Sequence, residues 1–364
     1  MAGIYIHVPF CTVKCAYCDF YSVARPDKAQ AFVEAVAREY AARLDELGGE
    51  TVMTLYIGGG TPSLLSPELF ARLISPFDLS AVEEFTIEVN PDDVDSQRIE
   101  AWLAAGVNRV SIGIQSLDDK ELAAVGRRHN AAQAVEAIAL LQSKGITNIS
   151  GDLIYGLPEQ TIESFADSLR RLIDTGITHL SAYCLSYEEG TRLWRKLQQG
   201  LVTPADDELI EAMYSALCHT AKSSGFEHYE ISNFALPGYR SRHNSAYWRD
   251  VPYLGLGPGA HSLDSQGIRR YVPADIRAYI ANPEEAATID PEDSTDRAND
   301  RIMTSLRTAE GLALADFTDA QQRQISAAAA PHIAAGRLVT TPDGYTIPEE
   351  SFLLSDAIIR DLLL

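Results

Sequence analysis

The sequence predicts an α/β fold: an incomplete (β/α)6 barrel, a C-terminal α+β extension and a small winged-helix-like domain. Apolar segments of strand length recur every 25 to 50 residues from residue 3 onward, segments with helical apolar spacing lie between them, and this alternation stops after Glu188. Strands that alternate with helices imply parallel βαβ units and a buried sheet. Six units fit a barrel that is open where the last two strands of a full barrel would be.

A helical segment lies between each predicted strand and the next. The 27–47 segment has apolar residues at Phe32, Val36, Tyr40, Leu44 and Leu47, which is the spacing of a helix with one buried face. A doubly wound sheet is the alternative fold, but no G-x-G-x-x-G follows the first strand. The six predicted strands are Ile4–Val8, Val52–Ile57, Phe85–Val89, Arg109–Ile114, Ile149–Tyr155 and His179–Leu185.

Three domains are expected: a partial barrel over residues 1–205, an extension over 206–282 and a C-terminal domain over 283–364. In the extension, 206–223 has a helical pattern and 227–234 an extended one. Residues 284–300 carry seven acids and one base and are expected to form a solvated linker. Beyond it, two helical stretches (296–307 and 318–335), a hairpin over 338–347 and a last helix resemble the layout of a winged-helix domain.

Composition excludes several classes of protein. Hydrophobic residues make up 46% and charged residues 22%, which is ordinary for a soluble chain. The formal charge of −21 disfavours a nucleic acid partner, because binding to polyanions needs a basic surface. The first residues show no basic region and no long apolar segment, so no signal peptide is expected. The five cysteines do not suggest a disulfide framework, and a cytoplasmic location is expected. Peripheral membrane association stays open.

Three cysteines gather in the loop after the first strand. Cys11, Cys15 and Cys18 have the spacing C-x3-C-x2-C, and thiols so close together converge on one soft metal centre. A four-iron cube takes four thiolates when fully ligated, so three would leave one iron open for a ligand. The alternative is a structural zinc with His7 or Cys184 as fourth ligand, although zinc sites usually pair two short spacings and no second pair exists here.

Polar or glycine residues end each predicted strand. Besides the cysteines, they are the Gly58–Gly60 turn, Glu88 with Asn90, Gln115 and Asp152. The carboxyl ends of barrel strands form the active face, so these residues are expected to share one surface. Taken singly, each is as well explained as a helix cap or a turn residue. Without Cβ atoms, the glycine turn lets backbone groups approach the ammonium and carboxylate of a ligand.

The motifs taken together resemble one family. The cysteine loop is followed in order by Gly-Gly-Gly-Thr-Pro, Ile-Glu-Val-Asn-Pro, Gly-Ile-Gln-Ser and Asp-Leu-Ile-Tyr-Gly-Leu-Pro, and this order is similar to that of the HemN/HemW group of radical S-adenosylmethionine (SAM) proteins. The resemblance covers nearly the whole chain and implies a radical SAM barrel with a [4Fe–4S] cluster on Cys11, Cys15 and Cys18. It also implies SAM contacts at Tyr5, Tyr17, Gly59, Gly60, Thr61, Glu88, Gln115, Arg127 and Asp152.

Three departures favour the heme-chaperone branch of that group over its dehydrogenase branch. Phe20 stands where the dehydrogenase has a fourth cysteine, the first strand starts at residue 3 without a preceding segment, and a His-Asn-x-x-Tyr-Trp signature is present. Imidazole is a common axial ligand of heme iron, and aromatic rings offer flat apolar area to the macrocycle. The signature therefore implies heme contacts at His243, Asn244, Tyr247 and Trp248.

The alternative for His243, taken as an isolated histidine, is a hydrogen-bonded structural role. His7 and His261 are lesser candidates for a heme ligand. The resemblance implies a protein that binds heme and passes it to client hemoproteins. The alternative function is an oxygen-independent coproporphyrinogen III dehydrogenase, in which the reduced cluster cleaves SAM to a radical that abstracts a substrate hydrogen. Radical chemistry on an unrelated small substrate and homodimer formation also stay open.

Overall fold

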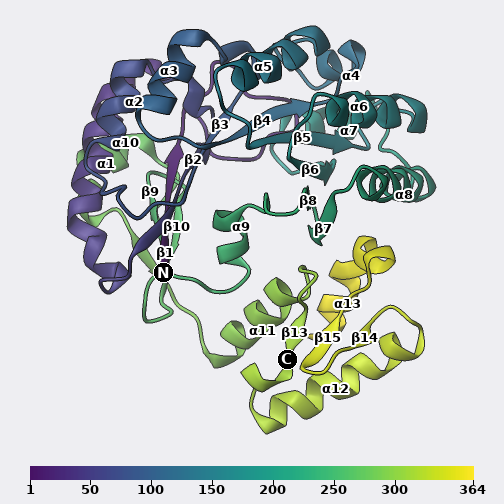
Figure 1. Cartoon of the computed structure of the whole chain (residues 1–364). Helices are drawn as coiled ribbons and strands as arrows, with labels where there is room; N and C mark the ends of the chain where they lie inside the picture. Colours follow the sequence, from purple (N-terminus) through teal and green to yellow (C-terminus); the bar gives the residue numbers. More distant parts are fainter.

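A long sheet with helices on its outer face forms the centre of the molecule (Figure 1). The structure, a computed structural model, describes residues 1–364 apart from the side chain of Pro26. Six parallel strands lie side by side in chain order, each hydrogen-bonded to the next. They are β1 (Ala2–Val8), β2 (Val52–Gly59), β3 (Glu84–Val89), β4 (Arg109–Gln115), β5 (Ile149–Tyr155) and β6 (His179–Cys184).

The strand order decides between the two predicted folds. A doubly wound sheet reverses direction at a switch point, so its neighbouring strands are not all consecutive. Here the order β1 to β6 never reverses, and the crossover helices cover one face (Figure 1). The partial barrel is confirmed. Its helices are α1 (Ala29–Arg43), α2 (Pro67–Ile74), α3 (Ser96–Ala104), α4 (Asp119–Ala124), α5 (Ala131–Ser143) and α6 (Ile162–Asp174).

Side chains at the helix starts explain where several of these helices begin. Ser66, Asp95, Asn130 and Thr161 each accept a hydrogen bond from a backbone N–H in the first turn of α2, α3, α5 and α6. Such caps satisfy donors that have no partner inside the helix. Ser66, Asp95 and Thr161 each follow a strand after a short connection, whereas Asn130 follows α4, so the starts of these helices are set by local sequence.

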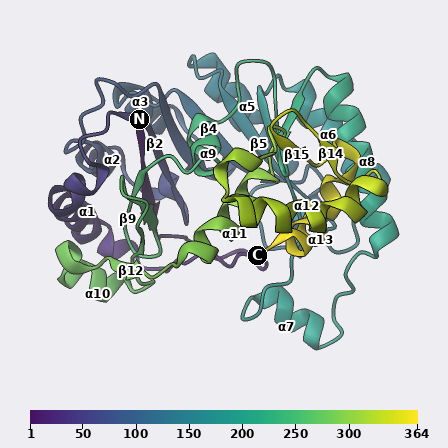
Figure 2. The same ribbon diagram turned by 90° about the horizontal axis from the view of Figure 1, so that it is seen from below.

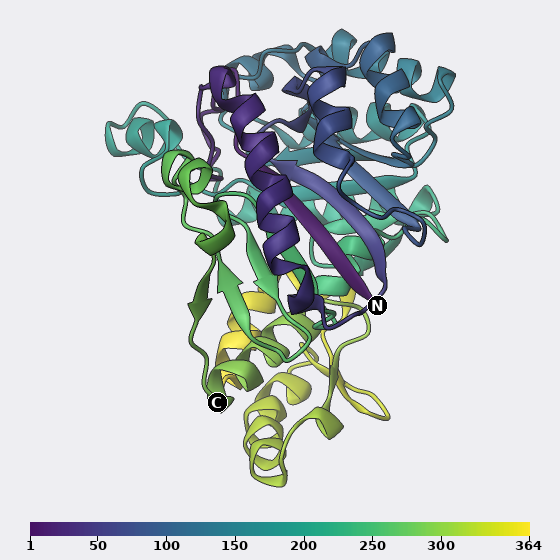
Figure 3. The ribbon, with the colours of Figure 1, turned by 90° about the vertical axis from the view of Figure 1, so that its left-hand side faces the viewer.

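Strands from later in the chain extend the sheet at both edges. Next to β1 lie β9 (Tyr253–Leu256), which is parallel to it, and then antiparallel β10 (His261–Leu263) and β11 (Arg269–Tyr271). Figure 3 shows these strands beside β1 and α1. Next to β6 lie β8 (Asn233–Ala235) and β7 (Glu227–Glu230). The segment 227–234, expected as one extended stretch, is therefore the start of a hairpin.

The acidic segment 284–300 was wrongly predicted to be a linker throughout. It contains β12 (Thr288–Asp290), which pairs with β11 at the edge of the sheet, and the first part of α11 (Ser294–Ser305). Backbone hydrogen bonds form the strand while its side chains stay exposed, so an acidic composition does not prevent it. The Asp293 side chain caps α11.

The C-terminal region has its own small sheet, β13–β15–β14, and packs against β7 (Figures 1 and 2). The large sheet contains strands from each of the three predicted domains, and the division into domains stays a prediction. No helix among the described residues is long and apolar enough to cross a bilayer. The remaining helices are α7 (Arg192–Gln198), α8 (Asp207–Ser223), α9 (Arg242–Tyr247), α10 (Ile276–Ala281), α12 (Asp319–Ala334) and α13 (Ser355–Leu362), and the strands of the small sheet are β13 (Leu312–Ala313), β14 (Val339–Thr340) and β15 (Gly344–Thr346).

Alternation along β1 separates the core from the barrel interior. Ile4, Ile6 and Val8 belong to the hydrophobic core, whereas Tyr5 and His7 point to the opposite face because successive strand residues alternate. The carboxyl end of β1 opens into the cysteine loop. The core therefore holds the strand from which that loop starts.

Candidate functional site

A cavity of about 560 Å³ lies at the carboxyl ends of the barrel strands. The three loop cysteines line it, together with all but one of the residues expected to contact SAM. The structure thus brings together segments from Cys11 to Glu188, because the strands are parallel and their ends meet at one face. The expected residues on its wall are Tyr17, Gly59, Gly60, Thr61, Glu88, Gln115, Arg127 and Asp152.

The cysteine loop is fastened to the barrel by its own backbone. The Cys11 N–H donates to the Val23 carbonyl at 3.3 Å, and the Ala16 N–H donates to the Val125 carbonyl at 2.9 Å. Burial raises the pKa of the Cys18 thiol to about 11. That thiol is protonated at neutral pH without a metal, and iron would displace the proton because a bound sulfur is a thiolate. Three thiols on an anchored loop fit a cluster ligand set.

The structure bears on the zinc alternative. Both ring nitrogens of His7 already have hydrogen-bond partners, because Nδ1 lies 3.1 Å from the Tyr5 hydroxyl and Nε2 lies 2.8 Å from the Tyr21 carbonyl. Cys184 lines the same cavity as the loop. Within the described chain, the three loop cysteines do not form the tight group of donor atoms that a single ion needs. Their wider spacing suits a multi-iron cluster better than zinc.

A chain of polar contacts links two of the cysteines across the cavity. The Cys11 Sγ and Thr61 Oγ1 atoms are 3.3 Å apart, and the Asn90 amide donates to Thr61 Oγ1 at 3.4 Å. The Arg127 guanidinium donates to Asn90 Oδ1 at 2.8 Å and to Cys15 Sγ at 3.4 Å. Arg127 therefore places a positive charge where a thiolate would develop.

Two buried carboxyl groups face the cavity from β3 and β5. Glu88 accepts hydrogen bonds from the Tyr56 hydroxyl at 2.8 Å and from the Gly59 N–H at 3.0 Å. Burial raises the pKa of Glu88 to about 7 and the pKa of Asp152 to about 6. The Ser111 hydroxyl donates to Asp152 at 3.1 Å. Carboxyl groups held in this way are suited to a cationic ligand, which would favour their ionised forms.

Backbone conformation shapes the wall in two places. Gly59 has a φ of +104°, and a Cβ there would lie 2.7 Å from the His7 ring, so both conformation and space require glycine. Gln115 has a φ of 68° at the end of β4, where the pairing register shifts. A non-glycine residue in this conformation is strained, and strain of this kind clusters at ligand sites.

Gly60, which lies on the cavity wall as expected, also has a packing role. A Cβ at this position would lie 2.6 Å from the Phe10 carbonyl oxygen and 2.9 Å from that of Val8. The space that Gly60 leaves free is therefore occupied by the backbone that leads into the cysteine loop. A side chain there would disturb the loop as well as any ligand.

Tyr5 is the expected SAM contact that the structure does not bring to the cavity wall. Its ring lies inside the barrel, with its centroid 6.0 Å from that of Tyr56 and 6.5 Å from that of His243. Tyr5 thus belongs to an aromatic layer beneath the cavity.

The histidine of the His-Asn-x-x-Tyr-Trp signature lies on α9 (Arg242–Tyr247) and points into the barrel. Its side chain is buried, with Nδ1 2.8 Å from Thr54 Oγ1 and Nε2 2.7 Å from the Tyr247 hydroxyl. Burial lowers the pKa of His243 to about 3, so the ring is neutral. A neutral imidazole is what iron requires, but one of these hydrogen bonds must break before the ring can bind a metal.

The other residues of the signature are nearer the surface. Asn244, Tyr247 and Trp248 are half-buried, and Trp248 lines a second cavity of about 160 Å³ between α9 and the C-terminal region. His261, the other candidate outside the barrel, is exposed on β10. The structure gives no contact between these residues and the larger cavity.

Asn90, expected on this face together with Glu88, joins Thr61 to Arg127. Several other residues at the large cavity were not predicted. Tyr56 positions Glu88 from β2. Other lining residues, which carry no local signal, include Ser111, Gly113, Tyr183, Cys184 and Glu188.

Comparison with known proteins agrees with this site. Residues 5–172 match the Radical SAM superfamily. The chain is 32% identical over 320 residues to the heme chaperone HemW of Lactococcus lactis, covering 86% of this chain and 83% of that protein. It is 33% identical over 379 residues to the heme chaperone HemW of Mycobacterium tuberculosis, and this match covers 99% of this chain and 94% of that protein.

Among solved structures, the coproporphyrinogen III oxidase HemN of Escherichia coli, a radical SAM enzyme, superposes with a TM-score of 0.84. The match covers all of this chain and 90% of that one at 21% identity, so it shows a shared fold. The sequence relatives are similar to the chain over most of their length, so they show the family as well as the fold. The chain belongs to the HemW family of radical SAM proteins.

Proposed function

We propose that this protein is a heme chaperone, which binds heme together with a [4Fe–4S] cluster and SAM and delivers heme to client hemoproteins. The relatives that carry this name are similar to the chain over most of its length. The observation that carries the proposal is the placement of α9 directly behind the cavity. His243 stacks on Tyr56, and Tyr56 donates a hydrogen bond to Glu88 on the cavity wall.

The radical SAM family implies the cluster and SAM, and the residues present fit both. Cys11, Cys15 and Cys18 would hold the cluster. When bound, a reduced cluster supplies an electron to SAM. The cavity residues would bind and orient SAM, with Glu88 and Asp152 near its positive groups and the Gly59–Thr61 turn offering backbone groups to the amino acid part.

Heme is proposed to bind at α9, with His243 as the iron ligand through Nε2. That nitrogen is hydrogen-bonded to Tyr247, which is half-buried, whereas Nδ1 faces Thr54 in the interior. Release of Tyr247 would therefore free Nε2 toward the surface while Thr54 still orients the ring. Asn244, Tyr247 and Trp248 would provide the neighbouring contacts.

The test uses anaerobically reconstituted protein. Hemin should bind with a defined stoichiometry by absorption titration, and the loaded protein should pass heme to apomyoglobin, which serves as the acceptor. The same preparation is then incubated with coproporphyrinogen III, SAM and reductant. Formation of protoporphyrinogen, or failure to bind hemin, would contradict the proposal and favour the dehydrogenase alternative or another radical reaction.

A further inference from the structure

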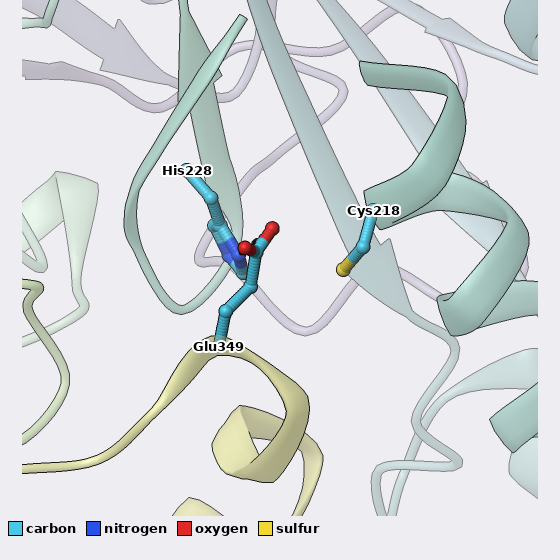
Figure 4. Close-up of side chains that lie close together, drawn as sticks. All are labelled: Cys218, His228 and Glu349. Atoms are coloured by element: carbon cyan, nitrogen blue, oxygen red, sulfur yellow. Dashed lines mark ion pairs between the residues drawn. The ribbon is translucent and has the colours of Figure 1, made fainter. Parts of the chain in front are cut away.

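Three side chains with metal-binding atoms meet at a place outside the lining of the SAM cavity (Figure 4). Cys218 lies on α8 (Asp207–Ser223), His228 on β7, and Glu349 at the start of the 3-10 turn Glu349–Leu354. One donor atom from each lies within 4.8 Å of the other two. His228 belongs to the edge strand of the barrel sheet, Cys218 to the helix that precedes this strand, and Glu349 to the C-terminal region.

The His228 ring is held firmly by apolar neighbours. It stacks on Phe234, with centroids 4.0 Å apart, and meets the edge of Phe352 at 5.0 Å. Only 3% of its side chain is exposed. The ring nitrogen Nε2 faces the Ile231 carbonyl at 3.5 Å, which directs Nδ1 toward Cys218 and Glu349.

Nδ1 of His228 is a buried polar atom without a hydrogen-bond partner among the described residues. Its distance to Glu349 Oε1 is 3.6 Å, longer than a hydrogen bond. The Tyr214 hydroxyl neighbours Cys218. Buried polar atoms are nearly always paired, so the unpaired Nδ1 indicates that something else binds there.

The carboxylate is available for a cation. Lys222 Nζ lies 3.4 Å from Glu349 Oε2, which leaves Oε1 facing the histidine. A protonated His228 paired with Glu349 is the simpler explanation of these two residues, but it gives the thiol of Cys218 no role. One sulfur, one nitrogen and one oxygen donor are a ligand set that zinc accepts.

We propose that Cys218, His228 and Glu349 bind Zn²⁺, with water as the fourth ligand. The thiolate disfavours Mg²⁺ and Ca²⁺, which prefer oxygen ligands. Zinc bonds of about 2.0 to 2.3 Å would draw the three donor atoms closer together than they lie here, and the thiol would lose its proton to solvent. The ion would join the C-terminal region to the β7 edge of the barrel.

The test is a zinc titration of full-length protein whose cluster has been reconstituted, so that the loop cysteines are occupied. Chelator-treated protein should take up one Zn²⁺ per chain, and zinc should raise its unfolding temperature. Cys218→Ser and His228→Gln should each weaken zinc binding at least about tenfold, because loss of even an outer partner of a metal site has that effect. Glu349→Gln should weaken it as well.

Two matched controls come from the same chain. Cys184→Ser removes a thiol in the other cavity, and His219→Gln removes an exposed imidazole one residue from Cys218. Both should bind zinc as the unaltered protein does. Zinc X-ray absorption of the unaltered protein should show one sulfur among nitrogen and oxygen ligands, and this measurement needs no variant to fold. A spectrum without sulfur, or equal zinc affinity in Cys218→Ser, would overturn the proposal.

Discussion

The imidazole of His243 stacks on the ring of Tyr56, with centroids 5.1 Å apart and planes inclined by 24°. Tyr56 donates from its hydroxyl to Glu88 at 2.8 Å, so one side chain contacts both the α9 signature and the wall of the SAM cavity. A shift of His243 toward a metal would remove one face of the Tyr56 ring from contact. We therefore expect heme binding at α9 and ligand binding in the cavity to influence one another through Tyr56.

The first prediction concerns the cluster. Cys15→Ala, like Cys11→Ala or Cys18→Ala, should abolish the [4Fe–4S] cluster, because two thiolates cannot hold a cube whose fourth iron already lacks a protein ligand. Iron content and absorption after anaerobic reconstitution measure the loss. Cys184→Ala and Cys218→Ala should keep full iron content. Cys184→Ala is the more informative control, because Cys184 lines the same cavity as the loop cysteines. Loss of iron in this variant would show that Cys184 is a cluster ligand.

The second prediction separates ligand binding from cluster assembly. Asp152→Asn should weaken SAM binding with little change in iron content, because Asp152 bonds to serine hydroxyls and to no loop cysteine. Gly60→Val should lower both SAM affinity and iron content, because the valine side chain would meet the backbone of Val8 and Phe10. Equilibrium dialysis with labelled SAM and iron analysis on both variants make the comparison. Normal iron content in Gly60→Val would show that the loop adapts.

The third prediction is a pH dependence. The pKa of Glu88 is raised to about 7 by burial, so the free cavity binds a proton there below that pH. A cationic ligand favours the ionised form, and SAM affinity should rise as pH increases from 6 to 8, by up to about tenfold per unit below the pKa. Glu88→Gln should bind SAM more weakly at pH 8 and without this dependence. An unchanged slope in that variant would assign the proton to another group.

The fourth prediction tests the proposed heme ligand. His243→Ala should weaken heme binding by more than about tenfold and shift the heme absorption bands, with iron of the cluster unchanged. Tyr247→Phe removes the hydrogen bond to Nε2 and should leave heme affinity equal or higher. The pair distinguishes a ligand from a structural histidine. If His243→Ala binds heme with an unaltered spectrum, the histidine is structural.

The fifth prediction concerns acid stability. Burial lowers the pKa of His243 to about 3, below the value of about 6.5 expected in the unfolded chain. The unfolded state therefore binds an extra proton between these values, and stability is present in full above pH 6.5 and lost as pH falls toward 3. Urea unfolding at several pH values should show that the free energy of unfolding falls less steeply with decreasing pH in His243→Gln than in the unaltered protein. Exposed His219→Gln should show the unaltered slope.

The strands and the cysteine loop could be predicted from the sequence because their signals are local. The apolar run of β5 predicted its bounds to the residue, and the spacing within one loop predicted which thiols would line the same cavity. Polar residues after apolar strands were placed on one face, because parallel strands end at the same edge. These features depend on residues within one turn or strand of each other.

Tertiary structure alone decided which distant residues touch. Asn90 and Arg127 meet through the register of β3 and β4 and the return of the loop after α4, and nothing in either segment encodes that distance. The resemblance implied a SAM contact at Tyr5 but could not tell its depth below the cavity wall, and the side chain of His243, implied as a heme contact, lies inside the barrel. The group of Cys218, His228 and Glu349 exists only because the C-terminal region packs on β7, and side-chain contact across such an interface is set by packing between elements, which local pattern does not determine.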